Sequence, residues 1–201
     1  MKAFHLRTIP AELDWRIQPT EWALQGDEGL SISAAGMTDL FIDPETGAAS
    51  DSAPVALFTP SEGSFILSAR VEPSFGSTFD AGVLHVWVRG DLWAKLCFER
   101  SPQGEPTVVS VVTRGVSDDC NSVVVPGGSV FLRVSQLERA TAFHYSTDGR
   151  VWRLVRYFSL GSRAGMRAGF SSQSPTGPGC RSVFSRVDYR AERLTDLRNG
   201  T

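Results

Sequence analysis

The sequence lacks the features by which membrane and nucleic-acid-binding proteins are most easily recognised. No apolar run approaches the roughly 20 residues needed to cross a bilayer as a helix. The 20 basic residues nearly balance the 22 acidic ones, so a formal net charge of −2 leaves no field to attract a polyanion. The amino-terminal segment MKAFHLRTIPAELDW contains no apolar signal core. We therefore expect a cytoplasmic protein with neither a membrane nor a nucleic acid as its partner.

Cysteine is also scarce, and the sequence patterns of several enzyme classes are missing. Cys97, Cys120 and Cys180 are odd in number and widely spaced, which fits neither a metal-ligand pattern nor a disulfide framework and favours reduced, partly buried thiols. The phosphate-binding patterns GxGxxG and GxxxxGK[ST] are absent, as are a nucleophile elbow and the E-x-D-x-x-E pattern of sandwich glucanases. These absences give no support to an acyl-transfer or redox enzyme, and we expect no cofactor.

What the sequence does contain is a succession of short strand signals. Apolar residues make up 41% of the chain, and short runs rich in Val, Phe, Leu and Thr are broken by Gly, Pro, Asp and Ser. The predicted strands are 21–34, 55–59, 63–73, 81–89, 92–99, 106–114, 122–125, 129–136, 140–146, 150–158, 165–172 and 181–191. Only 191–200 look helical or frayed. Without a repeat or linker, this pattern predicts one all-β domain over 1–201, an antiparallel sandwich or barrel.

The segment AGVLHVWVRGDLWAKLCFER predicts a hairpin with two different faces. Like faces must pair, so a loop of Arg89, Gly90 and Asp91 would set Val88 opposite Leu92 and continue that register along both strands. Trp87 then lies opposite Trp93, and His85 opposite Lys95. The core face carries Leu84, Val86, Val88, Ala94, Leu96 and Phe98. The opposite face carries His85, Trp87, Arg89, Trp93, Lys95 and Glu99.

Aromatic rings and charges together on an outward sheet face predict a binding surface. Trp87 and Trp93 would stack on sugar rings, or else pack on each other. His85 would make a polar contact or act as a general base, the alternative being a hydrogen-bonded structural histidine. Glu99 is the best single carboxyl for acid–base chemistry, and the alternative is a surface ion pair with Lys95.

Further polar candidates follow in the sequence. VTRGVSDDCNS is interpreted as a polar loop whose Asp118 or Asp119 would approach Glu99, with calcium binding conceivable and turn formation the commoner role. His144 alternates with its apolar neighbours and would join the same polar surface. With His85 and Glu99 it could supply zinc ligands, but nothing in the spacing requires this, and we predict no metal site.

Two turn-rich segments are given structural roles. In FHYSTDGRVW, Asp148 and Gly149 form a strong turn signal, so Asp148 is interpreted as structural and not catalytic. SSQSPTGPGC is predicted to be a rigid rim loop that could close one end of a binding cleft.

Several segments in order resemble a known family. They are AGVLHVWVRGDLWAKLCFE, SVVTRGVSDDCNS, VFLRVSQ, FHYSTDGRVW and AGFSSQSPTGPGCRSVFSRVDY, which together span about residues 80–190. They are similar to regulation-of-enolase-like proteins, which look like concanavalin A-like lectin and glucanase sandwiches. The resemblance implies a concanavalin A-like jelly roll and a link to carbohydrate metabolism. It implies no catalytic residues, because fold does not define activity.

These observations lead to one expected function and two alternatives. We expect a non-catalytic ligand-binding or regulatory protein that recognises a carbohydrate-like or small polar ligand through the aromatic and charged face. The first alternative is a sandwich-type glycan hydrolase with Glu99 and either Asp118 or Asp119 as its carboxyl pair. The second is a protein-interaction module, with a protein partner or a second copy bound through an edge strand or the same face.

Overall fold

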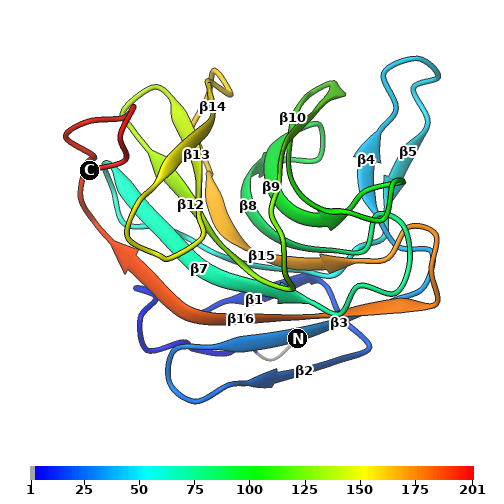
Figure 1. Cartoon of the computed structure of the whole chain (residues 1–201). Coiled ribbons are helices and arrows are strands. Elements are labelled where there is room, and N and C mark those ends of the chain that lie inside the picture. The colour runs from blue at the N-terminus through cyan, green and yellow to red at the C-terminus, as the bar shows by residue number, and fades with distance from the viewer. Residues whose placement is uncertain (1–2) are drawn as a thin grey trace.

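The computed structural model describes residues 3–201, which form two seven-stranded antiparallel sheets packed face to face (Figure 1). The first sheet has the order β1 (Asp14–Ile17), β6 (Val55–Phe58), β15 (Arg167–Gln173), β8 (Ala81–Arg89), β9 (Leu92–Arg100), β10 (Pro106–Arg114) and β11 (Val116–Val124). The second has the order β14 (Arg153–Phe158), β13 (Thr141–Ser146), β12 (Val130–Gln136), β7 (Phe65–Pro73), β16 (Gly179–Arg190), β3 (Leu30–Ala35) and β2 (Glu21–Leu24). This all-β jelly-roll sandwich of the concanavalin A-like type is the predicted fold class.

A small hairpin stands apart from both sheets. It consists of β4 (Leu40–Ile42) and β5 (Ala49–Asp51), and Figure 1 shows it beside the first sheet. The Ile42 N–H donates to the Ser117 hydroxyl of β11 at 2.9 Å, which connects the hairpin to the far edge of that sheet. In the described part of the chain, no helix is long and apolar enough to span a membrane.

The core lies between the two sheets and is built by the period-two alternation of the strands. From the first sheet it takes the predicted face of β8 and β9: Leu84, Val86, Ala94, Leu96 and Phe98, all buried, with Val88 partly buried against them. From the second sheet it takes residues such as Leu67, Val134 and Phe143. Burying a side chain of this size stabilises the fold by about 1.5–3 kcal/mol.

The β8–β9 hairpin has the predicted pairs but a different turn. His85 lies opposite Lys95 and Trp87 opposite Trp93, as the parity argument required. Arg89, however, pairs with Leu92, and the register shifts between Trp87 and Arg89. The loop is therefore shorter than the predicted three residues, and a bulge at Val88 absorbs the extra residue. A bulge restores like-with-like pairing just as a longer loop would, and the sequence pattern does not distinguish the two.

The segment VTRGVSDDCNS is not a loop: it contains the end of β10, the turn at Gly115 and most of β11, which corrects the expectation. β11 is an edge strand that pairs only with β10 and is largely exposed, so it carries polar residues instead of an apolar alternation. The predicted strand 122–125 covers only its end. The predicted strand 21–34 is divided into β2 and β3, the short strands β1, β4 and β5 went unpredicted, and 191–200 form turns with no helix.

The Asp148–Gly149 turn has the predicted structural role. The Asp148 carboxylate accepts hydrogen bonds from the N–H groups of Arg150 and Val151, at 2.8 and 2.9 Å. Together with the Ser146 hydroxyl, these bonds lower the pKa of Asp148 to about 2. Gly149 has φ +74°, a conformation that glycine adopts without strain.

Candidate functional site

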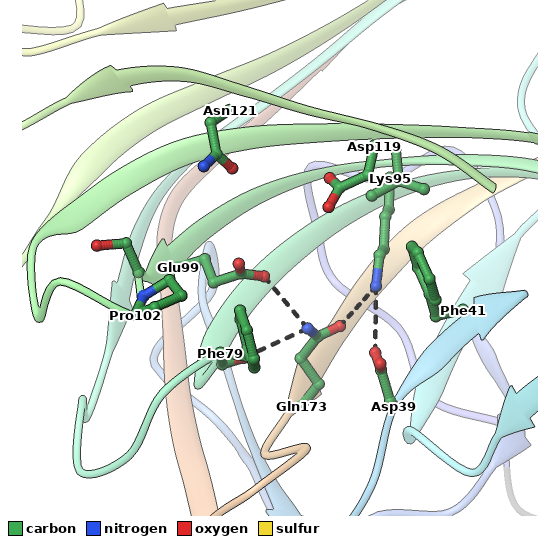
Figure 2. A pocket seen from close by; sticks show the side chains of 11 residues that line it. Asp39, Phe41, Phe79, Lys95, Glu99, Pro102, Asp119, Asn121 and Gln173 are labelled. Carbon is green, nitrogen blue, oxygen red and sulfur yellow. Dashed lines mark hydrogen bonds and ion pairs between the residues drawn. The ribbon is translucent and has the colours of Figure 1, made fainter. Parts of the chain in front are cut away.

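A pocket of about 260 Å³ opens on the outward face of the first sheet, where β9, β10 and β11 approach the β4–β5 hairpin (Figure 2). Its lining residues are Asp39, Phe41, Phe79, Lys95, Glu99, Ser101, Pro102, Val111, Asp119, Asn121 and Gln173. They come from chain segments that are far apart in the sequence, so the pocket is a product of the sandwich as a whole.

Strand register explains why the charged groups of the pocket face one another. Lys95 and Glu99 lie four residues apart on β9, so both side chains leave the sheet on the same face. Val111 of β10 pairs with Lys95 on one side and with Asp119 of β11 on the other. Asp119 is thus two strands, roughly 10 Å, from Lys95 across the sheet. The intervening Val111 has a short side chain, and the pocket lies above it.

Lys95 is a buried cation held by two partners. Its side chain is only 3% exposed, and Nζ donates to Asp39 Oδ1 at 3.2 Å and to Gln173 Oε1 at 3.0 Å (Figure 2). Burial by itself lowers the pKa of Lys95, but the nearby anions, chiefly Asp39, outweigh that effect and raise it. Lys95 therefore remains charged and presents a fixed positive group at the base of the pocket.

Glu99, unlike Lys95, is mostly uncharged at neutral pH. Gln173 Nε2 lies 3.4 Å from Glu99 Oε2 and 3.4 Å from the Phe79 carbonyl oxygen, so one amide connects Lys95, Glu99 and the loop at the pocket mouth. Burial raises the pKa of Glu99 to about 8, and Asp119 and Asp39 add to the rise against the opposing charge of Lys95. At neutral pH most of the Glu99 population is protonated and can donate a hydrogen bond.

β11 contributes two further polar groups. Partial burial raises the pKa of Asp119, although Lys95 opposes the shift. The Asn121 side chain makes no hydrogen bond to any of residues 3–201, and within the same range Asp119 forms no ion pair. The Cys120 backbone N–H also acts on the Asp119 carboxyl and opposes the rise of its pKa. The pocket therefore offers the Asn121 amide and a carboxyl that keeps oxygen lone pairs free for a ligand.

Two phenylalanines line the pocket beside the polar groups. Phe41 belongs to β4, and Phe79 belongs to the loop that precedes β8. Phe79 is 36% exposed and has φ +68°, a left-handed conformation that is unfavourable for a bulky side chain. Fully buried Asp80 holds this loop, because its carboxylate accepts from Ser77 N at 2.7 Å and from the Ser174 hydroxyl at 2.6 Å. Backbone strain of this kind persists where the surroundings fix it, often at ligand sites.

Comparison with known proteins places the chain in a family. Residues 15–192 match the family model described as "Protein of unknown function (DUF1349)". The chain belongs to the DUF1349 family. Among curated proteins, none is significantly similar to it in sequence.

Solved structures of similar shape support the fold. A functionally unknown protein from Saccharomyces cerevisiae is 23% identical, with a TM-score of 0.80 over 90% of this chain and 97% of that one. The GH43 protein BlXynB from Bacillus licheniformis is 16% identical, with a TM-score of 0.71 over 89% of this chain but only 37% of its own. The carbohydrate-binding module CBM66 from Bacillus subtilis is 14% identical, with a TM-score of 0.56 over 88% and 95%. At these identities the likeness concerns the fold alone.

The two tryptophans that were predicted to stack on sugar rings are buried. Trp87 and Trp93 point to the outward face as predicted, and their rings are parallel at 6.4 Å between centroids. Both are nevertheless buried, Trp93 completely, in a cluster with Leu40, Ala53, Val55, Leu57 and Val111, against which Phe41 packs. This structure therefore supports packing of the two indoles on each other, and their ring faces are not accessible for stacking on a sugar.

His85 is buried beside the pocket and does not line it. Neither ring nitrogen has a hydrogen-bond partner within residues 3–201, so the expected structural hydrogen bond is not observed. Burial, with Lys95 and Arg16 nearby, lowers the pKa of His85 to about 3. The imidazole is therefore neutral at physiological pH.

Three other candidates lie away from the pocket, which corrects their placement on a common surface. His144 is on β13 of the second sheet, with Nε2 2.9 Å from the Leu197 carbonyl oxygen. Asp118 leaves β11 on the side opposite to Asp119 and pairs with Arg156 at 2.7 Å. Arg89 pairs with Asp91 across the exposed turn at 2.8 Å. A Glu99–Asp118 pair and a zinc set that includes His144 are thus not assembled, because strand alternation and sheet assignment separate their members.

Of the nine predicted ligand residues, the pocket contains Lys95, Glu99 and Asp119. The ion pair of Lys95 is with Asp39 and not with Glu99. Sequence reasoning missed Asp39, Phe41, Phe79 and Gln173. Only Gln173 had a local signal, since it lies in the segment SSQSPTGPGC that was expected to border a cleft.

Proposed function

We propose that this protein is a non-catalytic binding protein that holds a small carbohydrate-like ligand in the pocket above Lys95. The observation that carries the proposal is the combination, in one pocket, of a buried cation, a carboxyl that is protonated at neutral pH, unfilled amide and carboxyl groups, and two aromatic side chains. Binding sites for small polar ligands typically combine apolar walls with a few fixed polar groups that set orientation.

The chemistry of the pocket suits a polyhydroxyl compound. Lys95 and protonated Glu99 donate hydrogen bonds, Asp119 accepts them, and the Asn121 amide does both. Each sugar hydroxyl is likewise a donor and an acceptor. Phe41 and Phe79 offer apolar surface to the C–H faces of a ring. The volume lies below the range of about 300–1,000 Å³ that is typical of sites for drug-sized ligands, so the proposed occupant is of the size of a single sugar ring.

A titration tests this directly. Neutral mono- and disaccharides would be added to the isotope-labelled protein while amide shifts are followed by nuclear magnetic resonance. We expect shifts concentrated on β9, β11 and the loop that carries Phe79, and affinity reduced about tenfold in Phe79→Ala and Glu99→Gln, the order expected for losing one good contact. Glu138→Gln, at an exposed glutamate outside the pocket, is the control. A sugar panel that moves none of these signals would rule the proposal out.

A glycan hydrolase remains the second candidate, because of one specific observation. A carboxyl with a pKa of about 8 is a suitable general acid, and Asp119 supplies a second carboxyl in the same pocket. Glycan turnover by the wild type, lost in Glu99→Gln while sugar binding is retained, would establish this function in place of simple binding. The similarity to GH43 proteins concerns the fold and identifies no catalytic residue in this chain.

Regulation of a metabolic enzyme, a cytoplasmic location and a protein partner stay predictions. An interaction module would use an unpaired sheet edge, such as β2, β14 or β11. Light scattering across a concentration series, with and without sugar, would detect a homodimer.

A further inference from the structure

A second polar depression, independent of the pocket above Lys95, lies on the outer face of the second sheet. It has a volume of about 340 Å³ and is formed by β7, β12, the turn between β13 and β14, and the end of β16. The charged side chains that line it are Arg133, Arg150, Arg186, Arg190, Asp148 and Asp188. We call it the arginine groove. The chain's carboxyl end lies near the end of β16 (Figure 1), and Arg133 Nη1 donates to the Gly200 carbonyl oxygen at 2.6 Å.

Arg133 is the fixed base of the groove. It is 5% exposed, and its guanidinium lies 3.6 Å from the centroid of the Trp152 ring. Its Nε is buried and has no hydrogen-bond partner within residues 3–201. Burial and the neighbouring charge of Arg190 lower the pKa of Arg133 to about 10, although Asp188 and Glu192 oppose the shift. A buried guanidinium with an unfilled donor, crowded by a second cation, is a favourable environment for an anion.

Arg186 is presented by an irregularity in β16. The pairing of β16 with β7 shifts register between Ser185 and Asp188, and Arg186 has φ +50°. Its guanidinium lies 5.8 Å from the centroid of the Phe131 ring. A bulge changes the direction of a side chain, and a left-handed conformation at a long non-glycine residue is unfavourable unless the surroundings fix it. The bulge brings Arg186 to the same depression as Arg133.

The two aspartates of the groove are already engaged. The Asp148 carboxylate caps its own turn through the N–H groups of Arg150 and Val151. Asp188 pairs with Arg190 at 3.2 Å, and Arg190 also contacts Glu192. Arg150 and Arg186 form no ion pair in the part of the chain that the structure describes. Four guanidinium groups thus face three carboxylates, counting Glu192 beside the groove, and the excess is positive.

We propose that the arginine groove binds the phosphoryl group of a small organic phosphate. Guanidinium groups bind phosphate oxygens through paired, charge-assisted hydrogen bonds, and Arg150 and Arg186 have donors free for this. A long polyanion such as a nucleic acid fits less well, since the chain carries a net charge of −2 and the arginines are confined to one depression. This site is separate from the sugar pocket, and its test does not depend on that proposal.

The test uses inorganic pyrophosphate as the probe, titrated into the full chain at low ionic strength and followed by amide shifts and calorimetry. We expect saturable binding, with shifts on the end of β16 and the turn at Asp148, and an affinity about tenfold lower in Arg186→Gln and lower again in Arg150→Gln/Arg186→Gln. Both arginines are exposed, so the variants should melt at the wild-type temperature. The matched control is Arg181→Gln, an exposed arginine on the same strand outside the groove.

Each outcome decides the matter. Pyrophosphate binding that Arg181→Gln leaves intact and Arg186→Gln weakens supports the groove. Absence of saturable binding, or equal weakening by the groove and control substitutions, overturns it, because a general attraction to surface charge would produce the second result.

Discussion

The outward face of the β8–β9 hairpin is closed at one end and open at the other. Near the turn, Trp87 and Trp93 are buried in a cluster to which β4, β6 and the segment before β6 contribute apolar side chains. Farther along the same face, Lys95 and Glu99 line an open pocket. Side chains alternate between the two faces of the sheet at both ends of the hairpin, so the face on which a side chain lies is determined locally by its strand. Whether that side chain meets solvent depends on segments that arrive from elsewhere in the chain.

The largest expected effect concerns the closed end. Trp93→Ala should reduce the free energy of unfolding by about 3–5 kcal/mol, because it removes a fully buried indole and leaves a cavity. Phe79→Ala at the open end should reduce it by less than about 1 kcal/mol, since that ring is partly exposed. Urea unfolding of both variants measures the contrast. Similar losses in the two would show that the ends do not differ as described.

The next effect concerns the buried ion pair. Asp39→Asn should lower the free energy of unfolding by about 1–3 kcal/mol, because the Lys95 ammonium would stay buried with two neutral amide oxygens, and no carboxylate, as its hydrogen-bond partners. Combining it with Lys95→Met should recover part of the loss, since the uncompensated charge is then gone. A double variant no more stable than Asp39→Asn would mean that the pair matters through packing and not through charge.

A pH effect should distinguish the open end further. The pKa of Glu99 is about 8 in the folded state and near its ordinary value of 4.5 in the unfolded chain, so the folded state holds the proton more tightly. Between these values a rise in pH favours the unfolded state, by at most about 1.4 kcal/mol per unit. The free energy of unfolding should therefore fall from pH 5 to pH 8 by about 1–3 kcal/mol more in the wild type than in Glu99→Gln. Parallel pH profiles for the two proteins would contradict the shifted pKa.

The features that sequence reasoning predicted are those that a strand and its immediate partner determine. Parity alone paired Trp87 with Trp93 and His85 with Lys95. It also placed the apolar face of both strands in the core, and the Asp148 turn followed from its own side-chain chemistry. Each of these conclusions depends on contacts within about fifteen residues, where few alternatives compete.

What escaped prediction depends on distant contacts. Asp39 reaches Lys95 across 56 positions of sequence, and Gln173 reaches it across 78. The strand that covers the indoles, β4, has three residues and too short a pattern to detect. Phe79 lines the pocket from a backbone in a left-handed conformation, which no apolar periodicity signals. Four of the eleven lining residues are therefore placed by tertiary contacts and backbone conformation that no local sequence pattern signals.

The smallest effect compares two neighbours, Asp118 and Asp119, that leave β11 on opposite sides. Asp118→Asn weakens an exposed ion pair with Arg156 and should reduce the free energy of unfolding by at most about 1 kcal/mol. It should leave the titration of Glu99 unchanged.

Asp119→Asn removes a negative charge that favours the protonated form of Glu99, so the pKa of Glu99 should fall. The chemical shift of the Glu99 carboxyl carbon, recorded against pH, would follow the titration of Glu99 in both variants. An equal change in the pKa of Glu99 in the two variants would mean that Asp118 and Asp119 do not lie on opposite sides of β11 as described.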